Sequence, residues 1–69
     1  MRFNVEVERE DDGRWIAEIP EVPGAMAYGE TADAAVAKAY AIALRAIADD
    51  VEYLREAPPI SINLNREIA

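Results

Sequence analysis

The 69-residue chain contains no cysteine and no histidine. Without cysteine it forms no disulfide and no thiolate metal site, and without histidine it lacks the usual general base and the commonest imidazole ligand. No apolar run approaches the roughly 20 residues that a membrane-spanning helix needs, and the N-terminus has no signal-peptide core. We therefore expect a cytoplasmic protein with no membrane segment, no cofactor and no metal site.

The charge balance is acidic, with 14 aspartates and glutamates against 7 lysines and arginines and a net charge of −7. An acidic surface repels nucleic-acid phosphates and suits a basic protein partner, although solubility alone is the ordinary alternative. The length allows one domain, residues 1–69, with a small core. Since no disulfide or metal supports that core, oligomerisation is the remaining way to bury more apolar surface.

The first part of the chain predicts three short strands. Residues 3–7 alternate apolar and polar side chains, and Trp15, Ala17 and Ile19 then alternate with Ile16 and Glu18. The turn Asp11-Asp12-Gly13 between them is typical of a hairpin. Pro20 ends the second strand because proline donates nothing to a strand ladder. Residues 25–28 form the third strand, after which Gly29 lets the chain turn.

A long helix is expected from Ala32, with Thr31 as its N-cap. Nine of the seventeen residues from 32 to 48 are alanine, the best helix former. Ala57-Pro58-Pro59 ends the helix, and residues 60–64 alternate again as a fourth strand. The apolar stripe of the helix is predicted to consist of Val36, Tyr40, Ala43, Ile47, Val51 and Leu54.

These elements predict an α+β fold with the order β-β-β-α-β. Two hairpins make the first three strands antiparallel, and a right-handed crossover through the helix places the fourth strand beside the first. The expected result is a four-stranded mixed sheet of order 3-2-1-4 with one long helix on one face.

No residue combination predicts catalysis. Ser61 is the only serine, and no base stands near any candidate nucleophile. The carboxylates Glu8, Glu10, Asp11 and Asp12 cluster at the end of a hairpin, where a solvated turn is the ordinary interpretation. A metal-dependent nuclease is the competing one, and it needs carboxylates that converge from different elements. We predict that the chain is not an enzyme and has no catalytic residues.

Two apolar groups lie outside the predicted core. Ile42 and Tyr53 fall on a flank of the helix away from its main stripe, and a strip of this kind suggests a partner. Ile60 and Ile62 lie on the fourth strand, which is an uncharged edge of the sheet. Because open sheet edges invite pairing, we expect a homodimer or a higher oligomer that uses these residues or presents them to a partner.

The segment Pro20-Glu21-Val22-Pro23-Gly24, followed by Gly29-Glu30-Thr31 and an alanine-rich helix, resembles the HicB-like antitoxin family. The stretch from Gly13 to Glu18 is also similar to the second strand of that family. The resemblance covers residues 3–64 and corresponds to a short form that holds only the N-terminal core domain. The chain has Ala25 where the family often has cysteine.

The resemblance implies a partial RNase H-like fold without nuclease activity. It also implies an antitoxin of a type II toxin-antitoxin system, which binds and neutralises a basic HicA-type mRNA-cleaving toxin. Glu6, Glu8 and Glu21 would meet the cations of the toxin, and Pro23, Gly24 and Tyr28 would shape the contact. The alternative is a stand-alone HicB-like homo-oligomeric adaptor or ligand-binding module without a toxin.

Many members of the family carry a C-terminal ribbon-helix-helix or helix-turn-helix domain that binds operator DNA. The sequence stops at Ala69, directly after the predicted fourth strand. We therefore expect no direct DNA binding from this chain, which is either a short stand-alone member or a piece of a longer gene product.

Overall fold

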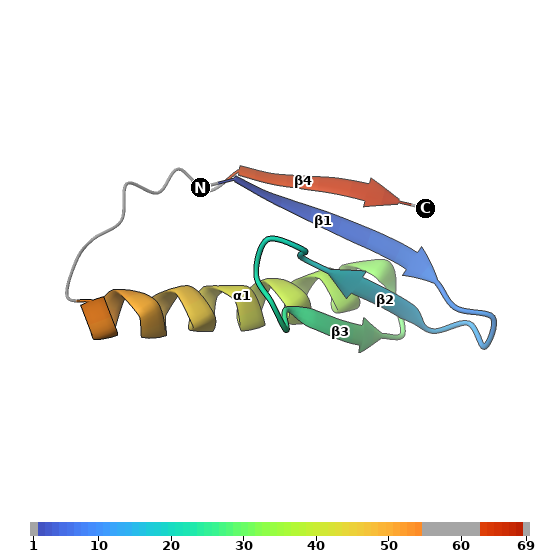
Figure 1. Cartoon of the computed structure of the whole chain (residues 1–69). Coiled ribbons are helices and arrows are strands. Elements are labelled where there is room, and N and C mark those ends of the chain that lie inside the picture. Colours follow the sequence, from blue (N-terminus) through green and yellow to red (C-terminus); the bar gives the residue numbers. More distant parts are fainter. Residues whose placement is uncertain (1, 55–62, 69) are drawn as a thin grey trace.

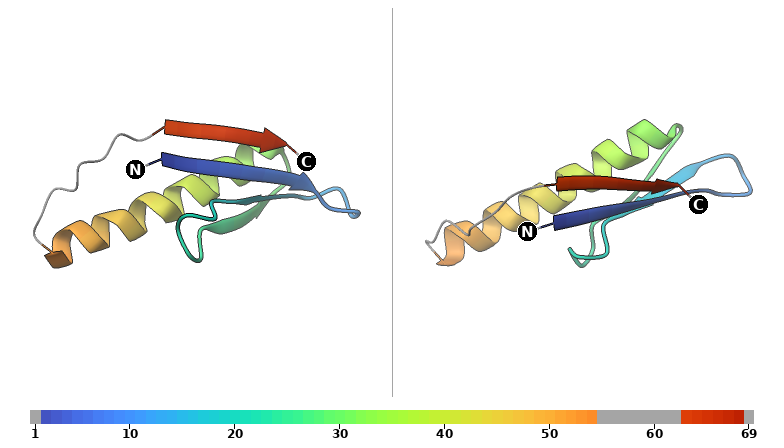
Figure 2. Two further views of the ribbon diagram at one scale, coloured as in Figure 1. Left: turned by 45° about the horizontal axis from the view of Figure 1, so that its top comes forward. Right: turned by 90° about the horizontal axis from the view of Figure 1, so that it is seen from above.

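The computed structural model describes residues 2–54 and 63–68 (Figure 1). The elements follow the order β1 (Arg2–Arg9), β2 (Trp15–Glu18), β3 (Met26–Gly29), α1 (Ala32–Leu54) and β4 (Asn63–Ile68). The first three strands form antiparallel pairs, β1 with β2 and β2 with β3. Helix α1 lies along one face of the sheet they form, as the two views of Figure 2 show.

The predicted sheet needs a correction at its fourth strand, which the sequence placed at residues 60–64. The antiparallel sheet has three strands, covered by one helix. The strand that pairs with β1 in parallel is β4, Asn63–Ile68, and the order of the strands in the sheet is β3-β2-β1-β4. Residues 60–62 lie outside the described residues. Hydropathy alternation ended the strand too early, at residue 64, because backbone pairing with β1 extends to Ile68.

The β1–β2 hairpin forms where the sequence predicts it. The backbone N–H of Glu10 donates to the carbonyl of Arg14 at 2.7 Å, and the N–H of Gly13 donates to the carbonyl of Glu10 at 3.0 Å. Gly13 has φ 91°, a left-handed conformation that glycine adopts without a steric penalty. The turn therefore closes on a local backbone network, and it fixes the register that places Val7 opposite Ala17.

The proline-rich connection between β2 and β3 consists of two consecutive turns. The N–H of Val22 donates to the carbonyl of Ile19, and the N–H of Ala25 donates to the carbonyl of Val22, both at 3.0 Å. Each turn has a proline directly after its first residue, where the fixed φ of proline is favourable. In the second turn Gly24 follows Pro23 with φ 86°, as a type II turn requires. The motif thus reverses the chain between two strands.

Helix α1 begins at the predicted N-cap. The hydroxyl of Thr31 accepts a hydrogen bond from the N–H of Ala34 at 3.0 Å, and Asp33 supplies a negative charge in the first turn. Just before this cap, Gly29 lies so close to the helix that an added Cβ would stand 2.5 Å from the backbone nitrogen of Ala35. Gly29 therefore permits a close approach of strand and helix.

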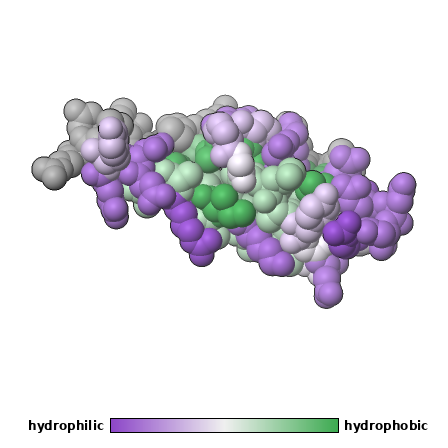
Figure 3. Space-filling view, turned by 60° about the horizontal axis from the view of Figure 1, so that its bottom comes forward, coloured by the Kyte–Doolittle hydropathy of each residue, from purple (hydrophilic) through white to green (hydrophobic). Residues whose placement is uncertain are grey.

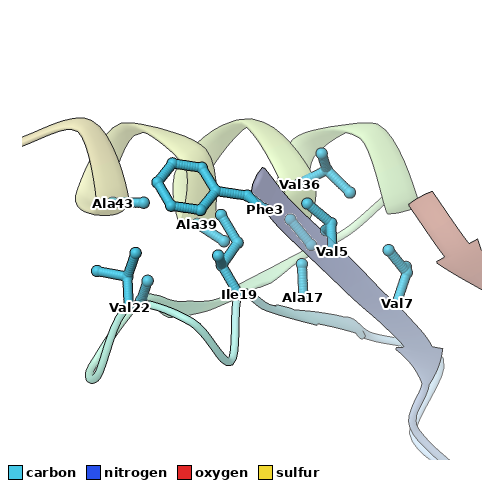
Figure 4. Packing of buried hydrophobic residues seen from close by; sticks show 11 residues of the cluster. Phe3, Val5, Val7, Ala17, Ile19, Val22, Val36, Ala39 and Ala43 are labelled. Atoms are coloured by element: carbon cyan, nitrogen blue, oxygen red, sulfur yellow. The ribbon is translucent and has the colours of Figure 1, made fainter. Parts of the chain in front are cut away.

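The core lies between α1 and the sheet. Figure 4 shows Phe3, Val5 and Val7 pointing from β1 toward the helix. Small side chains supply much of the rest, since five of the eleven buried apolar residues are alanines. They let the helix lie close to the strands. The buried set consists of Phe3, Val5, Val7, Ala17, Ile19, Val22, Ala25, Ala35, Val36, Ala39 and Ala43.

The first turns of α1 are covered by the sheet, whereas the last turns extend past its edge (Figure 1). At 100° per residue, Asp50 and Tyr53 share the side of Ala35, Ala39 and Ala43, yet both are exposed, Tyr53 at 87%. The described part of the chain contains no helix that combines the length and the apolar character needed to cross a membrane.

Candidate partner-binding site

The face of the sheet opposite α1 carries the most informative surface of the molecule. Because successive side chains of a strand point to opposite faces, the residues between the buried ones lie on this side. Among the described side chains none on this face is buried, and most are exposed. We call this surface the open face and define it by Asn4, Glu6, Glu8, Ile16, Glu18, Met26 and Tyr28.

The β1–β2 half of the open face is acidic. Glu6 and Glu18 are direct cross-strand partners, and both are exposed. The next outward position of β1 is Glu8, opposite Ile16. The register with β4 also makes Glu67 the parallel partner of Glu6. Like charges directly opposite each other destabilise a sheet, so the pair of glutamates is unfavourable for the fold alone.

The β2–β3 half of the open face is apolar. Met26 and Tyr28 of β3 are 48% and 42% exposed, and the register places Tyr28 beside the half-buried Ile16. Apolar surface is not confined to the open face, since Figure 3, a view of the side where α1 and the edge strand β3 lie, shows apolar surface in the middle between hydrophilic ends. The sequence predicts a contact role for Tyr28 but gives no signal for Met26 and Ile16, whose common face follows only from the strand register.

Arg14 lies at one end of the open face, between an acid and an aromatic ring. Its Nε donates to Oδ2 of Asp12 at 2.7 Å, and its guanidinium carbon lies 4.5 Å from the centre of the Tyr28 ring. The N–H of Arg14 also donates to Oδ1 of Asp12, and these hydrogen bonds lower the pKa of the Asp12 carboxyl. The charge of this arginine is thus compensated within the chain.

Glu21, predicted to meet a partner, has its carboxylate engaged inside the chain. Both oxygens accept hydrogen bonds from Asn4, one from the backbone N–H and one from the side-chain amide, each at 2.9 Å. These bonds, the backbone one foremost, lower the pKa of the Glu21 carboxyl. Pro23 and Gly24 are exposed in the neighbouring turn, and their backbone conformation serves the reversal of the chain.

The four apolar residues predicted as oligomer contacts lie in different surroundings. Ile42 is half-buried and packs against the core, whereas Tyr53 is exposed near the end of α1. Ile60 and Ile62 lie outside the described residues. Leu44, which was not predicted as a contact, is 39% exposed on α1. The structure therefore brings Glu6, Glu8 and Tyr28 onto one surface, and it does not bring Ile42 and Tyr53 there.

The carboxylates near the hairpin do not form a cage. Glu8 lies on the open face, and Asp12 is bound to Arg14. No group of three or more histidine, cysteine, aspartate or glutamate side chains within the described residues could hold a metal ion. Comparison of the chain with models of protein families, with curated proteins and with solved structures gives no match.

Proposed function

We propose that the chain is an antitoxin that binds and neutralises a basic HicA-type toxin, an mRNA-cleaving protein. The observation that carries the proposal is the acidic half of the open face, where Glu6 and Glu18 stand opposite each other. These like charges destabilise the free chain, and a cation of a partner that lies against them would relieve the repulsion. The net charge of −7 adds long-range attraction for such a partner.

The sequence motif supports the same proposal. The resemblance to HicB-like antitoxins rests on the segment from Pro20 to Gly24 and on Gly29-Glu30-Thr31. In the structure these residues build two turns, a close strand–helix contact and a helix cap. The motif therefore specifies the scaffold, and the charged surface of the scaffold performs the binding.

The test is inhibition of RNA cleavage by a purified HicA-type toxin. Adding the chain in equal amount should suppress cleavage, and the two proteins should elute as one complex. Raising the salt concentration should weaken the complex, because screening reduces attraction between exposed charges. A toxin that keeps its full activity in excess chain at low salt contradicts the proposal.

The alternative, a homo-oligomeric module without a toxin, has one observation in its favour. Leu44 and Tyr53 expose apolar surface on α1, away from the open face. A light-scattering mass of two or more chains that decreases in a Leu44→Ser variant would support self-association through the helix. A mass of one chain at all concentrations would contradict it.

A further inference from the structure

The open face combines an apolar half with an acidic half across three strands. Met26 and Tyr28 of β3 lie at one side, and Glu6 and Glu8 of β1 lie at the other, with Ile16 and Glu18 of β2 between them. Neighbouring strands are about 4.8 Å apart, so the outer rows of this surface are about 10 Å apart. A partner that matches both halves must therefore present apolar and positive side chains about that far apart.

An α-helix has these dimensions. Its diameter with side chains is about 10–12 Å, and an amphipathic helix separates apolar and charged residues to different sides. Helices also cover the faces of sheets in two- and three-layer folds. One face of this sheet is already covered by α1, and the described residues of the chain provide no second helix for the other.

The charges of the open face select the kind of helix. Glu6, Glu8 and Glu18 are exposed, and none of them has a cation partner among the described ion pairs. The described cation at the margin, Arg14, is already bound by Asp12. Arginine or lysine side chains of a partner would relieve the repulsion between Glu6 and Glu18, whereas an acidic helix would increase it.

We propose that the open face binds an amphipathic basic helix of a partner protein, laid along β2. Its apolar side chains contact Met26, Ile16 and Tyr28, and its cations lie over the glutamates of β1 and β2. This assignment rests on the proposed function for the identity of the partner, but the chemistry of the helix follows from the surface itself.

The experiment uses a synthetic helical peptide of about 18 residues, a length at which an isolated helix can form. The peptide has leucine at every third or fourth position and arginine directly after each leucine, so that the two kinds of side chain lie on adjacent sides. A peptide with glutamate in place of arginine is the control. NMR titration of the isotope-labelled chain should shift amide signals of β1, β2 and β3 with the arginine peptide only.

Two matched double variants separate a specific contact from general attraction. Glu6→Gln with Glu18→Gln should weaken binding of the arginine peptide roughly fivefold or more, because it removes two charges from the contact. Asp49→Asn with Glu52→Gln removes the same charge from exposed positions of α1 and should leave the affinity almost unchanged. Met26→Gln should weaken binding through the apolar half while the chain remains folded.

Three results would overturn the inference: shifts centred on α1, equal weakening by both double variants, or a mass of two chains that Met26→Gln abolishes. The last would assign the open face to a second copy. The proposed function fails separately. If the arginine peptide binds the open face but the toxin does not bind the chain, the antitoxin role is wrong. If the toxin binds and Glu6→Gln with Glu18→Gln has no effect on that complex, the surface is wrong.

Discussion

The carboxylate of Glu21 binds both the backbone N–H and the side-chain amide of Asn4, each at 2.9 Å. The register of the β1–β2 pair would place Pro20 opposite Asn4, just beyond the last paired residues Glu6 and Glu18. Glu21 thus supplies an acceptor to β1 where proline ends the second strand. The side chain has a structural role at the position where the sequence suggested a partner contact.

The first prediction follows from the lowered pKa of Glu21. A carboxyl whose pKa is lower in the folded than in the unfolded state stabilises the fold above its ordinary value of 4.5, and that contribution is lost as the pH falls through the folded-state value. Glu21→Gln should therefore lower stability at neutral pH, and the difference from the parent chain should shrink as the pH falls below 4.5.

Urea unfolding at several pH values measures this difference. Glu8→Gln is the control, since it removes the same charge from an exposed position of β1. A difference between the parent chain and Glu21→Gln that stays constant from neutral to acidic pH would show that the ionised carboxylate does not stabilise the fold.

The second prediction compares two glycines. Gly29→Ala places a Cβ 2.5 Å from the backbone nitrogen of Ala35, and backbone cannot give way as a flexible side chain can. We expect a loss of about 3 kcal/mol in the free energy of unfolding from this overpacking. The Cβ added by Gly24→Ala has no atom within 4 Å, but the residue must keep φ at 86°. We therefore expect a loss of only about 1 kcal/mol in the free energy of unfolding, from the left-handed backbone conformation. Similar losses in the two variants, measured by thermal or urea unfolding, would contradict the close approach.

The third prediction concerns the helix cap. Thr31→Ala removes the hydroxyl that accepts the N–H of Ala34 and should cost about 1 kcal/mol of stability. Thr31→Ser keeps the acceptor and should recover most of that loss. Circular dichroism during urea unfolding reports both variants, and equal destabilisation by alanine and serine would exclude the hydrogen bond as the cause.

The fourth prediction is that reversing a charge on the open face stabilises the free chain but weakens the binding of a basic partner. Glu18→Lys converts the cross-strand pair with Glu6 from like to opposite charges and should stabilise the free chain by about 0.5 kcal/mol. Glu8→Lys makes the same charge change opposite Ile16 and should bring less stabilisation. Both variants should weaken binding of a basic partner. A Glu18→Lys chain that is no more stable than Glu8→Lys would remove the evidence for repulsion.

Much of the scaffold is predictable because local chemistry specifies it. The alternation of Phe3, Val5 and Val7 places these residues in the core, and Thr31 caps the helix as predicted. The positive φ of Gly13 agrees with the predicted hairpin. Each of these features depends on neighbours within a few residues, which the sequence displays directly.

Other features depend on contacts between distant segments. Of the predicted inward stripe of the helix, Val36 and Ala43 are buried, whereas Tyr40 and Ile47 are only half-buried. Ala35 and Ala39, which lie outside that stripe, are fully buried, since close approach to the sheet selects for small size. Gly29 looked like a turn residue, and its actual role is to leave space for Ala35. The opposition of Glu6 and Glu18 and the shared face of Met26 and Tyr28 required the strand register.

The side chain of Lys38 binds the backbone at the edge of the sheet formed by β3. The ammonium group of Lys38 donates to the backbone carbonyl of Tyr28 at 3.3 Å, so this carbonyl points away from β2. A lysine at an edge strand discourages the addition of another strand. The edge at β3 is therefore less available for pairing between chains than the sequence alone indicated.

The many alanines of the core have a calorimetric consequence. The increase in heat capacity on unfolding grows with the apolar area that becomes exposed, and a buried alanine contributes far less area than a leucine or phenylalanine. Since Ala17, Ala25, Ala35, Ala39 and Ala43 occupy core positions, this chain should unfold with a small heat-capacity increment for its length. The curve of its stability against temperature should accordingly bend only gently.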